Sequence, residues 1–258
     1  MTSPSASAAL VAAMRQLKLD TLEGAFAYGG GDDLAKPGLG HRRRTRIVIP
    51  GRDARQHVVF LKRYLRDALL SRLRRWWTYG PGRSPAAVEA DNIRRVRQAG
   101  VTDIEALAWG QDRRRSYVVM SQAPGQSLEL CGPAFLEAQP HRAGELTAKL
   151  AELARRLHGA GLVHRDLYAC HVFLDDTPTG LELGLIDLAR VFRPRWRTFR
   201  WRVKDLAQLN YSMPPAWVRQ EWERFLELYC GQTISRERLR HAIDRKAARM
   251  RRWKGRPA

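Results

Sequence analysis

Residues 161–174, the segment GLVHRDLYACHVFL, constrain the fold of this chain more than any other stretch. Residues 145–157 before it carry leucines at helical spacing, and a glycine then ends the pattern. Residues 172–174 look like a short strand closed by two aspartates, and a second apolar strand over residues 183–186 ends on Asp187. The sequence therefore predicts a helix, a polar loop and a β-hairpin that is followed by an acidic side chain.

Protein kinases use this order of elements for phosphoryl transfer. In them the loop aspartate accepts the proton of the acceptor hydroxyl, a residue five positions later helps to hold metal, and the aspartate after the hairpin binds Mg²⁺. The corresponding residues here are Asp166, His171 and Asp187. A His-Arg-Asp tripeptide also occurs by chance, and the alternative is a capped helix followed by an ordinary surface hairpin. The helix before the loop, His171 and the Ile-Asp-Leu after the hairpin together favour a catalytic loop.

Charge is the unusual property of the composition. The 258 residues allow one large domain or two smaller lobes, and 44% hydrophobic residues is ordinary for a globular protein. The formal net charge is +20, and 39 of the 46 basic residues are arginine. Such a field attracts nucleic acid, an acidic membrane surface or a phosphorylated glycan, and arginine binds phosphate and carboxylate with two hydrogen bonds. A codon bias explains the surplus equally well, so we weigh function only where arginines gather near the loop.

The chain shows no sign of export or of a membrane span. Its three cysteines lack the spacing of a metal site, which predicts reduced thiols. No stretch approaches the roughly 20 apolar residues that a membrane span needs. Residues 1–14 lack a positively charged start, and we expect disorder there rather than a signal peptide. The expected localisation is cytoplasmic, including attachment to the cytoplasmic face of the inner membrane.

Residues 15–120 are predicted to form a sheet-rich, nucleotide-binding N-lobe. A glycine-rich interval over residues 29–40 suits close approach of backbone to phosphate, although no GxGxxG is present, and Gly24 beside it is a candidate contact. Residues 57–64 read as an apolar strand that carries Lys62 near its end. Kinases place there the lysine that holds the α- and β-phosphates, whereas the alternative is a solvated lysine.

A helix and a hinge complete this predicted nucleotide site. Residues 86–98 read as a helix with Glu89 in its first turn, where it would either pair with Lys62 or complement the helix dipole. Met120 and Gln122 stand at the end of the last strand, in the segment that would join the two lobes. We expect the adenine ring to bind there.

Residues 64–79 predict a basic amphipathic helix within the N-lobe. Leucines and a pair of tryptophans recur on one face, and arginines occupy the other. This pattern is typical of a helix that lies in a membrane interface. Packing of the same stripe on the rest of the domain is the alternative.

Residues 121–258 are predicted to form a C-lobe with the catalytic loop, an acceptor segment and a basic C-terminal helix. Residues 190–202 are rich in arginine and aromatic side chains, and their place after Asp187 indicates an anionic acceptor. Asp205 would brace the catalytic loop through backbone N–H groups or cap its own helix. Residues 235–254 form a basic helix that would bind anionic lipid or nucleic acid, or be solvated.

Three motifs in the right order resemble the lipopolysaccharide core heptose kinases, from the lipopolysaccharide-kinase branch of the protein-kinase-like fold. They are HRDLYACH at 164–171, LIDL at 185–188 and RWRVKDL at 200–206, with further matches at Arg43-Arg44-Thr45 and Phe60-Leu61-Lys62. The resemblance covers residues 20–230, and the His171 form of the loop is its most specific part.

The resemblance implies an α+β, two-lobed protein-kinase-like fold with a small antiparallel-sheet N-lobe and a mainly helical C-lobe. It also implies phosphorylation of a sugar hydroxyl, that of a heptose in the lipopolysaccharide inner core, with ATP and Mg²⁺ as cofactors. The implied partners are the core glycolipid and an anionic membrane surface, and nucleic acid is not expected. The resemblance implies that Asp166 is the catalytic base, that Lys62 binds phosphate and that Glu89 orients Lys62. It implies that Asp187 and His171 bind metal and that His164 and Asp205 give structural support. The implied acceptor-binding residues are Arg43, Arg44, Arg195, Arg197 and Arg202.

Two alternatives remain open on the sequence. The acceptor could be a Kdo sugar, a small molecule or a protein, although the absence of Asp-Phe-Gly and Ala-Pro-Glu motifs argues against a regulated protein kinase. The chain could also be a non-catalytic, basic, kinase-like binding module. Lys62, Asp166 and Asp187 together argue against that reading, because a scaffold has no need of all three.

Overall fold

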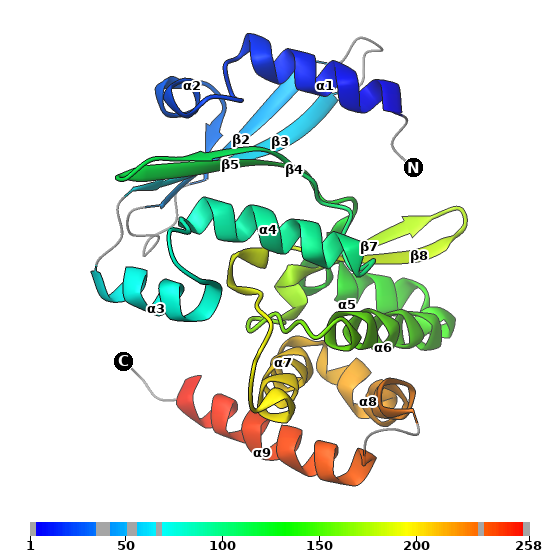
Figure 1. The fold of residues 1–258 in the computed structure, drawn as a ribbon. Coiled ribbons are helices and arrows are strands. Elements are labelled where there is room, and N and C mark those ends of the chain that lie inside the picture. The colour runs from blue at the N-terminus through cyan, green and yellow to red at the C-terminus, as the bar shows by residue number, and fades with distance from the viewer. Residues whose placement is uncertain (1–3, 35–41, 51–55, 66–68, 232–234, 255–258) are drawn as a thin grey trace. The chain divides into compact units, whose positions relative to one another are not determined.

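The computed structural model describes residues 4–34, 42–50, 56–65, 69–231 and 235–254 (Figure 1). Two compact units make up the chain. Unit 1 comprises Met1–Arg95 and Ile104–Gln122, and unit 2 comprises Val96–Asp103 and Ala123–Ala258. The last passage of the chain between them, from Gln122 to Ala123, falls in the segment that the sequence predicts as the hinge.

Unit 1 is built on an antiparallel sheet. Its five strands are β1 (Asp32–Asp33), β2 (Arg42–Pro50), β3 (Gln56–Leu65), β4 (Ala106–Gln111) and β5 (Arg115–Ser121), in the spatial order β1-β2-β3-β5-β4. The β-branched and aromatic residues of β3 and β5 suit this central position. Lys62 of β3 is paired with Arg44 on one side and Val118 on the other. The sheet therefore holds Lys62 between two neighbouring strands.

Helices α1 (Pro4–Gln16) and α2 (Leu22–Ala27) cover one face of the sheet (Figure 1). Leu10 and Met14 of α1 lie in one buried cluster with Val59 and Leu61 of β3. The prediction of disorder over residues 1–14 is therefore wrong for residues 4–14. These residues form a helix because the apolar side chains at positions 10 and 14 lie one helical turn apart and are buried against the sheet.

Two further helices follow β3. Helix α3 spans Leu69–Tyr79, so the predicted helix over residues 64–79 is wrong at its start. Tyr64 is buried and paired with Ser116 in the sheet, which makes Tyr64 and Leu65 the last residues of β3. Residues 66–68 lie outside the described part of the chain.

Helix α4 spans Pro85–Gln98. Ser84 begins it, because the Ser84 Oγ accepts a hydrogen bond of 3.1 Å from the backbone N–H of Ala87. Glu89, Ile93 and Val96 on its inner face are buried. The predicted helix over residues 86–98 is confirmed.

Unit 2 is mainly helical. Its elements are β6 (Gln126–Ser127), α5 (Leu128–Ala138), α6 (Ala143–Gly159), β7 (Val172–Thr177), β8 (Gly180–Leu185), α7 (Thr198–Ser212), α8 (Pro215–Cys230) and α9 (Arg236–Lys254), with short 3₁₀ turns at Pro140–Arg142, Ala169–His171 and Leu188–Arg190. Strands β7 and β8 form the predicted hairpin, and β6 adds to its edge. The α+β class predicted from the sequence is confirmed.

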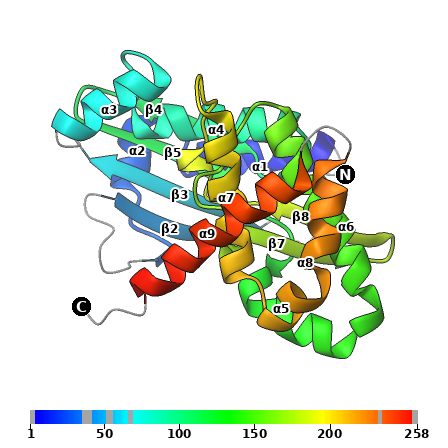
Figure 2. The ribbon, with the colours of Figure 1, turned by 90° about the horizontal axis from the view of Figure 1, so that it is seen from below.

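The core of unit 2 lies between α6 and α8. Leu146, Leu150 and Leu157 of α6 are fully buried, as are Trp217 and Phe225 of α8. The Trp217 ring also donates from Nε1 to the Thr147 hydroxyl at 3.0 Å, so its polar atom is satisfied inside the core. Helix α9 packs along α7, as Figure 2 shows. Among the helices that the structure describes, none is both long and apolar enough to span a bilayer.

Candidate active site

Unit 1 contributes a buried ion pair. Lys62 Nζ lies 2.5 Å from Glu89 Oε1, and the two side chains are 12% and 1% exposed. Strand β3 supplies the lysine and α4 supplies the glutamate. Glu89 thus lies opposite Lys62, as the kinase-like interpretation predicts, and is not a solvated first-turn residue.

Tyr64 is the second partner of Glu89. Its hydroxyl donates to Glu89 Oε2, and both residues are buried. A buried carboxylate is stable only when its oxygens are paired, and here each oxygen has its own donor. Tyr64 therefore fixes the orientation of Glu89, which in turn fixes Lys62.

The three positions predicted to contact the nucleotide differ in their surroundings. Gly24 lies inside α2, where a Cβ would stand only 2.1 Å from the backbone oxygen of Lys18. The glycine is thus required by packing, and we do not carry it into the nucleotide site. Met120 is buried in β5. The backbone N–H of Gln122 donates to the Val58 carbonyl at 3.1 Å, which ties the end of β5 to β3.

Unit 2 contains the loop that the sequence predicts as catalytic, and Asp205 of α7 holds it. The carboxylate of Asp205 is fully buried and accepts the backbone N–H groups of His164 and Arg165, each at 2.7 Å. His158 adds a third contact, with its Nε2 3.3 Å from Asp205 Oδ2. Asp205 thus braces the loop rather than capping its own helix.

Two residues beside the loop aspartate have unusual backbone conformations. Arg165 has φ +72° and Asp187 has φ +55°. Both values lie in the left-handed region, which residues other than glycine rarely adopt. Each such residue costs about 1–3 kcal/mol and persists only where its surroundings enforce it. At Arg165 the bond from its N–H to Asp205 supplies that enforcement. Conformational strain therefore gathers around Asp166, as at many functional sites.

His164 lies beneath the loop as a fully buried imidazole. Its Nε2 lies 2.9 Å from the carbonyl of Ile186, and since a carbonyl only accepts, Nε2 carries the proton. Within the described ranges its Nδ1 has no hydrogen-bond partner. Burial lowers the pKa of His164, so the ring stays neutral inside the protein. Through Ile186 it links the loop to the end of the hairpin.

Asp166 faces two cations. Arg190 Nη1 lies 2.6 Å from Asp166 Oδ2, and Lys204 Nζ lies 3.9 Å from Asp166 Oδ1. Lys204 also donates to the backbone carbonyl of Arg165. Burial lowers the pKa of Lys204 and the charge of Arg190 adds to this, whereas Asp166 opposes it. The carboxylate thus lies in a positive environment that also suits a phosphate group.

His171 and Asp187 lie side by side. His171 Nδ1 is 2.7 Å from the backbone oxygen of Asp166, so Nδ1 donates to this carbonyl, and Nε2 is the ring atom that faces away from this hydrogen bond. That Nε2 lies 3.8 Å from Asp187 Oδ2. Two ligand atoms at this separation fit one metal ion, and Mg²⁺ in phosphoryl-transfer sites needs only one or two protein ligands besides phosphates and water. No cluster of three or more candidate metal ligands occurs in the part of the chain that the structure describes.

The predicted acceptor arginines separate into two groups. Arg195 and Arg197 are exposed in the segment before α7, together with Trp196. Arg43 is exposed on β2 and pairs with Asp33 at 2.8 Å. Arg202, by contrast, donates to the backbone oxygen of His158 at 3.1 Å. Arg202 therefore holds the C-terminal end of α6, and we remove it from the acceptor group.

Four residues that contact the predicted site residues were not predicted from the sequence. They are Tyr64, His158, Arg190 and Lys204, and each makes its contact with a segment that is distant along the chain. Only Arg190 had a usable signal, since it closely follows Asp187 in the sequence. Gln208 also belongs here, because its Oε1 accepts the backbone N–H of Leu167 at 3.2 Å.

The comparisons with known proteins agree with this geometry. The lipopolysaccharide kinase (Kdo/WaaP) family matches residues 40–229. The lipopolysaccharide core heptose(I) kinase WaaP of Pseudomonas aeruginosa is 34% identical over 168 residues, which are 60% of this chain and 62% of that protein. The protein of the same name from Escherichia coli strain K12 is 30% identical over 155 residues, which are 55% of this chain and 58% of that protein. The matches thus span less than two thirds of the length of these relatives.

A solved structure supports the fold. The crystal structure of an aminoglycoside-3′-phosphotransferase of type VIII superposes with a TM-score of 0.54 at 18% identity, over 90% of this chain and 96% of that one. At this identity the likeness shows the fold alone, and it confirms the predicted protein-kinase-like fold. Because the family match covers most of the chain, this chain belongs to the lipopolysaccharide kinase (Kdo/WaaP) family.

Proposed function

We propose that this protein is an ATP- and Mg²⁺-dependent kinase that phosphorylates a sugar hydroxyl, that of a heptose, in the inner core of lipopolysaccharide. One observation carries the proposal: Asp166, His171 and Asp187 gather on one loop and hairpin in a member of this family. The relatives named as heptose(I) kinases support the choice of sugar.

Asp166 is the catalytic base. Its carboxylate accepts the proton of the sugar hydroxyl as that oxygen attacks the terminal phosphate of ATP. Arg190 now binds the Oδ2 of this carboxylate from a half-exposed position. Exchange of Arg190 from Asp166 to the incoming phosphate frees the carboxylate oxygen for the hydroxyl. Lys204 stays beside Asp166 and offsets negative charge that develops during transfer.

Lys62 binds the α- and β-phosphates of ATP, and Glu89 positions it. The buried pair keeps the ammonium group at a fixed place on the sheet, so little reorganisation accompanies nucleotide binding. The adenine contacts come from the end of β5, at Met120 and Gln122. Catalysis of phosphoryl transfer depends mainly on such positioning and on neutralised charge.

Asp187 and His171 would hold the metal ion, which would supply positive charge for the phosphate oxygens. Asp187 supplies the oxygen ligand that this ion prefers, and the Nε2 of His171 is oriented toward the same position by the hydrogen bond at Nδ1. His171 thus replaces the asparagine that protein kinases use.

The acceptor is an anionic glycolipid at the cytoplasmic face of the inner membrane. Arg195 and Arg197 present exposed guanidinium groups in the segment that follows Asp187, and Arg43 does so on β2, where Arg44 beside it is half-buried. Guanidinium groups bind the phosphates and carboxylates of core sugars with paired hydrogen bonds. The net charge of +20 favours the same negatively charged surface.

Phosphate transfer from radiolabelled ATP to purified lipopolysaccharide tests this function. The wild-type protein is expected to label a core that contains heptose and not a core truncated before heptose. Asp166→Ala abolishes labelling and retains ATP binding, whereas Asp175→Ala on strand β7 is the matched control and retains activity. Absence of transfer by the wild-type protein to any lipopolysaccharide, with ATP and Mg²⁺ present, contradicts the proposed function.

A further inference from the structure

Helix α3 of unit 1 is exposed over most of its length. None of its residues is buried, although it carries three leucines and two tryptophans. Leu70 is 81% exposed, Leu69 and Trp77 are 74% exposed, and Leu73 and Trp76 are at least half exposed. Large apolar side chains gathered at this density on a surface mark an interaction site. The alternative left open by the sequence, a stripe packed on its own domain, does not apply to α3.

The apolar and basic side chains of α3 are separated around the helix. At about 100° per residue, the leucines and tryptophans fall within an arc of about 120°. Arg72 and Arg74 lie at the two borders of this arc, and Arg75 lies opposite it. The helix contains no acidic residue. Such an arrangement suits an interface with an apolar layer on one side and negative charge at its border.

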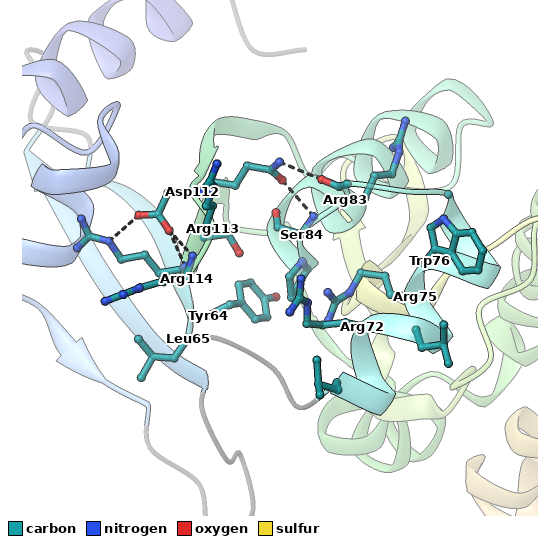
Figure 3. Close-up of a pocket in the computed structure, with 18 of the residues that line it drawn as sticks. Tyr64, Leu65, Arg72, Arg75, Trp76, Arg83, Ser84, Asp112, Arg113 and Arg114 are labelled. Atoms are coloured by element: carbon teal, nitrogen blue, oxygen red, sulfur yellow. Dashed lines mark hydrogen bonds and ion pairs between the residues drawn. The ribbon is translucent and has the colours of Figure 1, made fainter.

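A groove beside α3 extends the basic surface. It has a volume of about 850 Å³ and lies between α3 and the turn that joins β4 to β5 (Figure 3). Figure 3 shows Arg72 and Arg75 on the side of α3 and Arg113 and Arg114 on the side of the turn. Asp112 in that turn accepts the backbone N–H groups of Arg114 and Arg115, at 2.6 and 2.8 Å, so its carboxylate is engaged locally.

Several arginines line the groove. Burial lowers the pKa of Arg75, and the charge of Arg42 lowers it further. Phosphate suits such guanidinium groups through paired hydrogen bonds, and its negative charge would offset the charge of Arg42 at Arg75. The groove arginines therefore favour a phosphate group, and the leucines and Trp76 of α3, which also line the groove, favour an apolar phase. An anionic phospholipid surface combines both, whereas a protein partner would need a matching acidic and apolar face.

We propose that α3 docks the protein on an anionic phospholipid bilayer, with its leucines and tryptophans between headgroups and acyl chains and the groove arginines on lipid phosphates. This inference rests on the proposed function for its setting, since a kinase of a membrane glycolipid must work at a bilayer. It adds the element that makes the contact. The basic helix α9, which the sequence alone also allowed for this role, is not required.

Co-sedimentation with vesicles tests the docking without nucleotide or acceptor. Vesicles of phosphatidylglycerol and phosphatidylethanolamine are expected to bind the full-length protein, and vesicles of phosphatidylcholine are expected to bind it at least about tenfold more weakly. Leu70→Ser/Trp77→Ser lowers partitioning to the anionic vesicles by at least about tenfold, because both side chains lose their apolar contact with lipid. Leu130→Ser, which changes a leucine 76% exposed on α5, leaves partitioning within about twofold.

Charge variants test the second half of the proposal. Arg72→Gln/Arg113→Gln, which changes two exposed arginines of the groove, is expected to weaken binding to anionic vesicles by about tenfold or more, at roughly 1 kcal/mol for each charge. Arg155→Gln/Arg219→Gln changes two exposed arginines of unit 2 and serves as the matched control. Equal losses in the two double variants contradict docking by α3, because they would indicate a response to net charge alone.

Insertion of the tryptophans is tested by fluorescence. Lipids with brominated acyl chains are expected to quench the wild-type protein more than Trp76→Phe/Trp77→Phe, which keeps apolar rings and binding. If the serine variant fails to fold, this fluorescence comparison still tests whether the tryptophans insert into the bilayer.

Wild-type protein that does not bind anionic vesicles overturns the inference, and so does a dimer in solution that Leu70→Ser dissociates. Vesicle binding without phosphate transfer would contradict the proposed function alone, and transfer without vesicle binding would contradict the docking alone.

Discussion

The two units carry ion pairs of nearly equal length in different surroundings. Lys62 and Glu89 in unit 1 lie 2.5 Å apart, with side chains 12% and 1% exposed. Arg190 and Asp166 in unit 2 lie 2.6 Å apart, with side chains 51% and 19% exposed. Burial, and not distance, therefore separates them. The buried pair cannot lose one partner without leaving a charge in the interior, whereas water can replace a partner of the exposed pair.

This difference matches the work proposed for each pair. A lysine that holds phosphates gains from a fixed position, and its pairing with Glu89 and the further bond from Tyr64 provide one. A catalytic base must exchange its partner for the hydroxyl of the acceptor. The weaker, half-exposed contact of Asp166 allows that exchange. Loss of Asp166 should therefore lower activity and leave stability nearly unchanged, whereas loss of Lys62 should lower both.

The largest effect is expected on activity in unit 2. Asp166→Asn removes the proton acceptor and lowers the rate of phosphate transfer by about 10³-fold, within the usual range for loss of a general base. Because Arg190, the cation nearest Asp166, is half exposed and can be solvated, the free energy of unfolding changes by less than about 1 kcal/mol. Initial rates with saturating ATP, together with a thermal unfolding curve, measure both. A variant that keeps a tenth of the rate contradicts the role of Asp166.

The next effect is on stability in unit 1. Lys62→Met leaves Glu89 buried without its cation and is expected to cost about 3 kcal/mol of stability, beside the loss of activity. Lys62→Met/Glu89→Leu removes both charges and recovers at least about half of that stability, while activity stays lost. Chemical denaturation of the wild type, both single variants and the double variant gives the comparison. An additive double variant would show that the two side chains do not interact.

Acid is expected to act on unit 2 through His164. Its pKa is lowered by burial, so the folded protein keeps the ring neutral while the unfolded chain takes up a proton below about pH 6.5. Stability therefore falls as pH decreases from about 6.5 toward the lowered pKa, by at most about 1.4 kcal/mol for each pH unit. Denaturation midpoints between pH 5 and 8 should show a flatter dependence for His164→Asn than for the wild type. His141→Asn, at an exposed histidine, is the control.

The smallest effect belongs to the exposed pair. Arg190→Met is expected to change the free energy of unfolding by less than about 1 kcal/mol, because solvent already screens the contact with Asp166. Thermal unfolding measured beside Lys62→Met places the two pairs on one scale. If Arg190→Met loses as much stability as Lys62→Met, burial does not explain the difference between the two ion pairs.

Much of the site was predictable because it rests on local signals. An apolar strand with a lysine near its end, a helix with Glu89 on its inner face and a polar loop ahead of a hairpin each occupy a short stretch of sequence. The pairing of Lys62 with Glu89 required only that the sheet and α4 pack together. Asp205 was also predictable, since a carboxylate on the buried face of a helix suits the backbone N–H groups of a neighbouring loop.

The features that were predicted wrongly depend on tertiary contacts, which no short stretch of sequence encodes. The helix over residues 4–16 is stabilised by burial against the sheet, and its alanine-rich start reads equally well as disorder. The strand β3 continues through Tyr64 and Leu65 because β5 pairs with them, although their spacing also fits the helix that follows. Arg202 looked available to an acceptor in sequence, yet its guanidinium reaches the end of α6.

The proposed function requires that Lys62 of unit 1 and the acidic residues of unit 2 act on one nucleotide. A crystal structure of the full chain with Mg²⁺ and a non-hydrolysable ATP analogue tests it most directly. We predict hydrogen bonds from Lys62 Nζ to phosphate oxygens of the nucleotide, and a metal ion between those phosphates and Asp187. A nucleotide bound away from Lys62, or phosphates that touch Lys62 while Asp166 and Asp187 contact neither phosphate nor metal, would contradict the account.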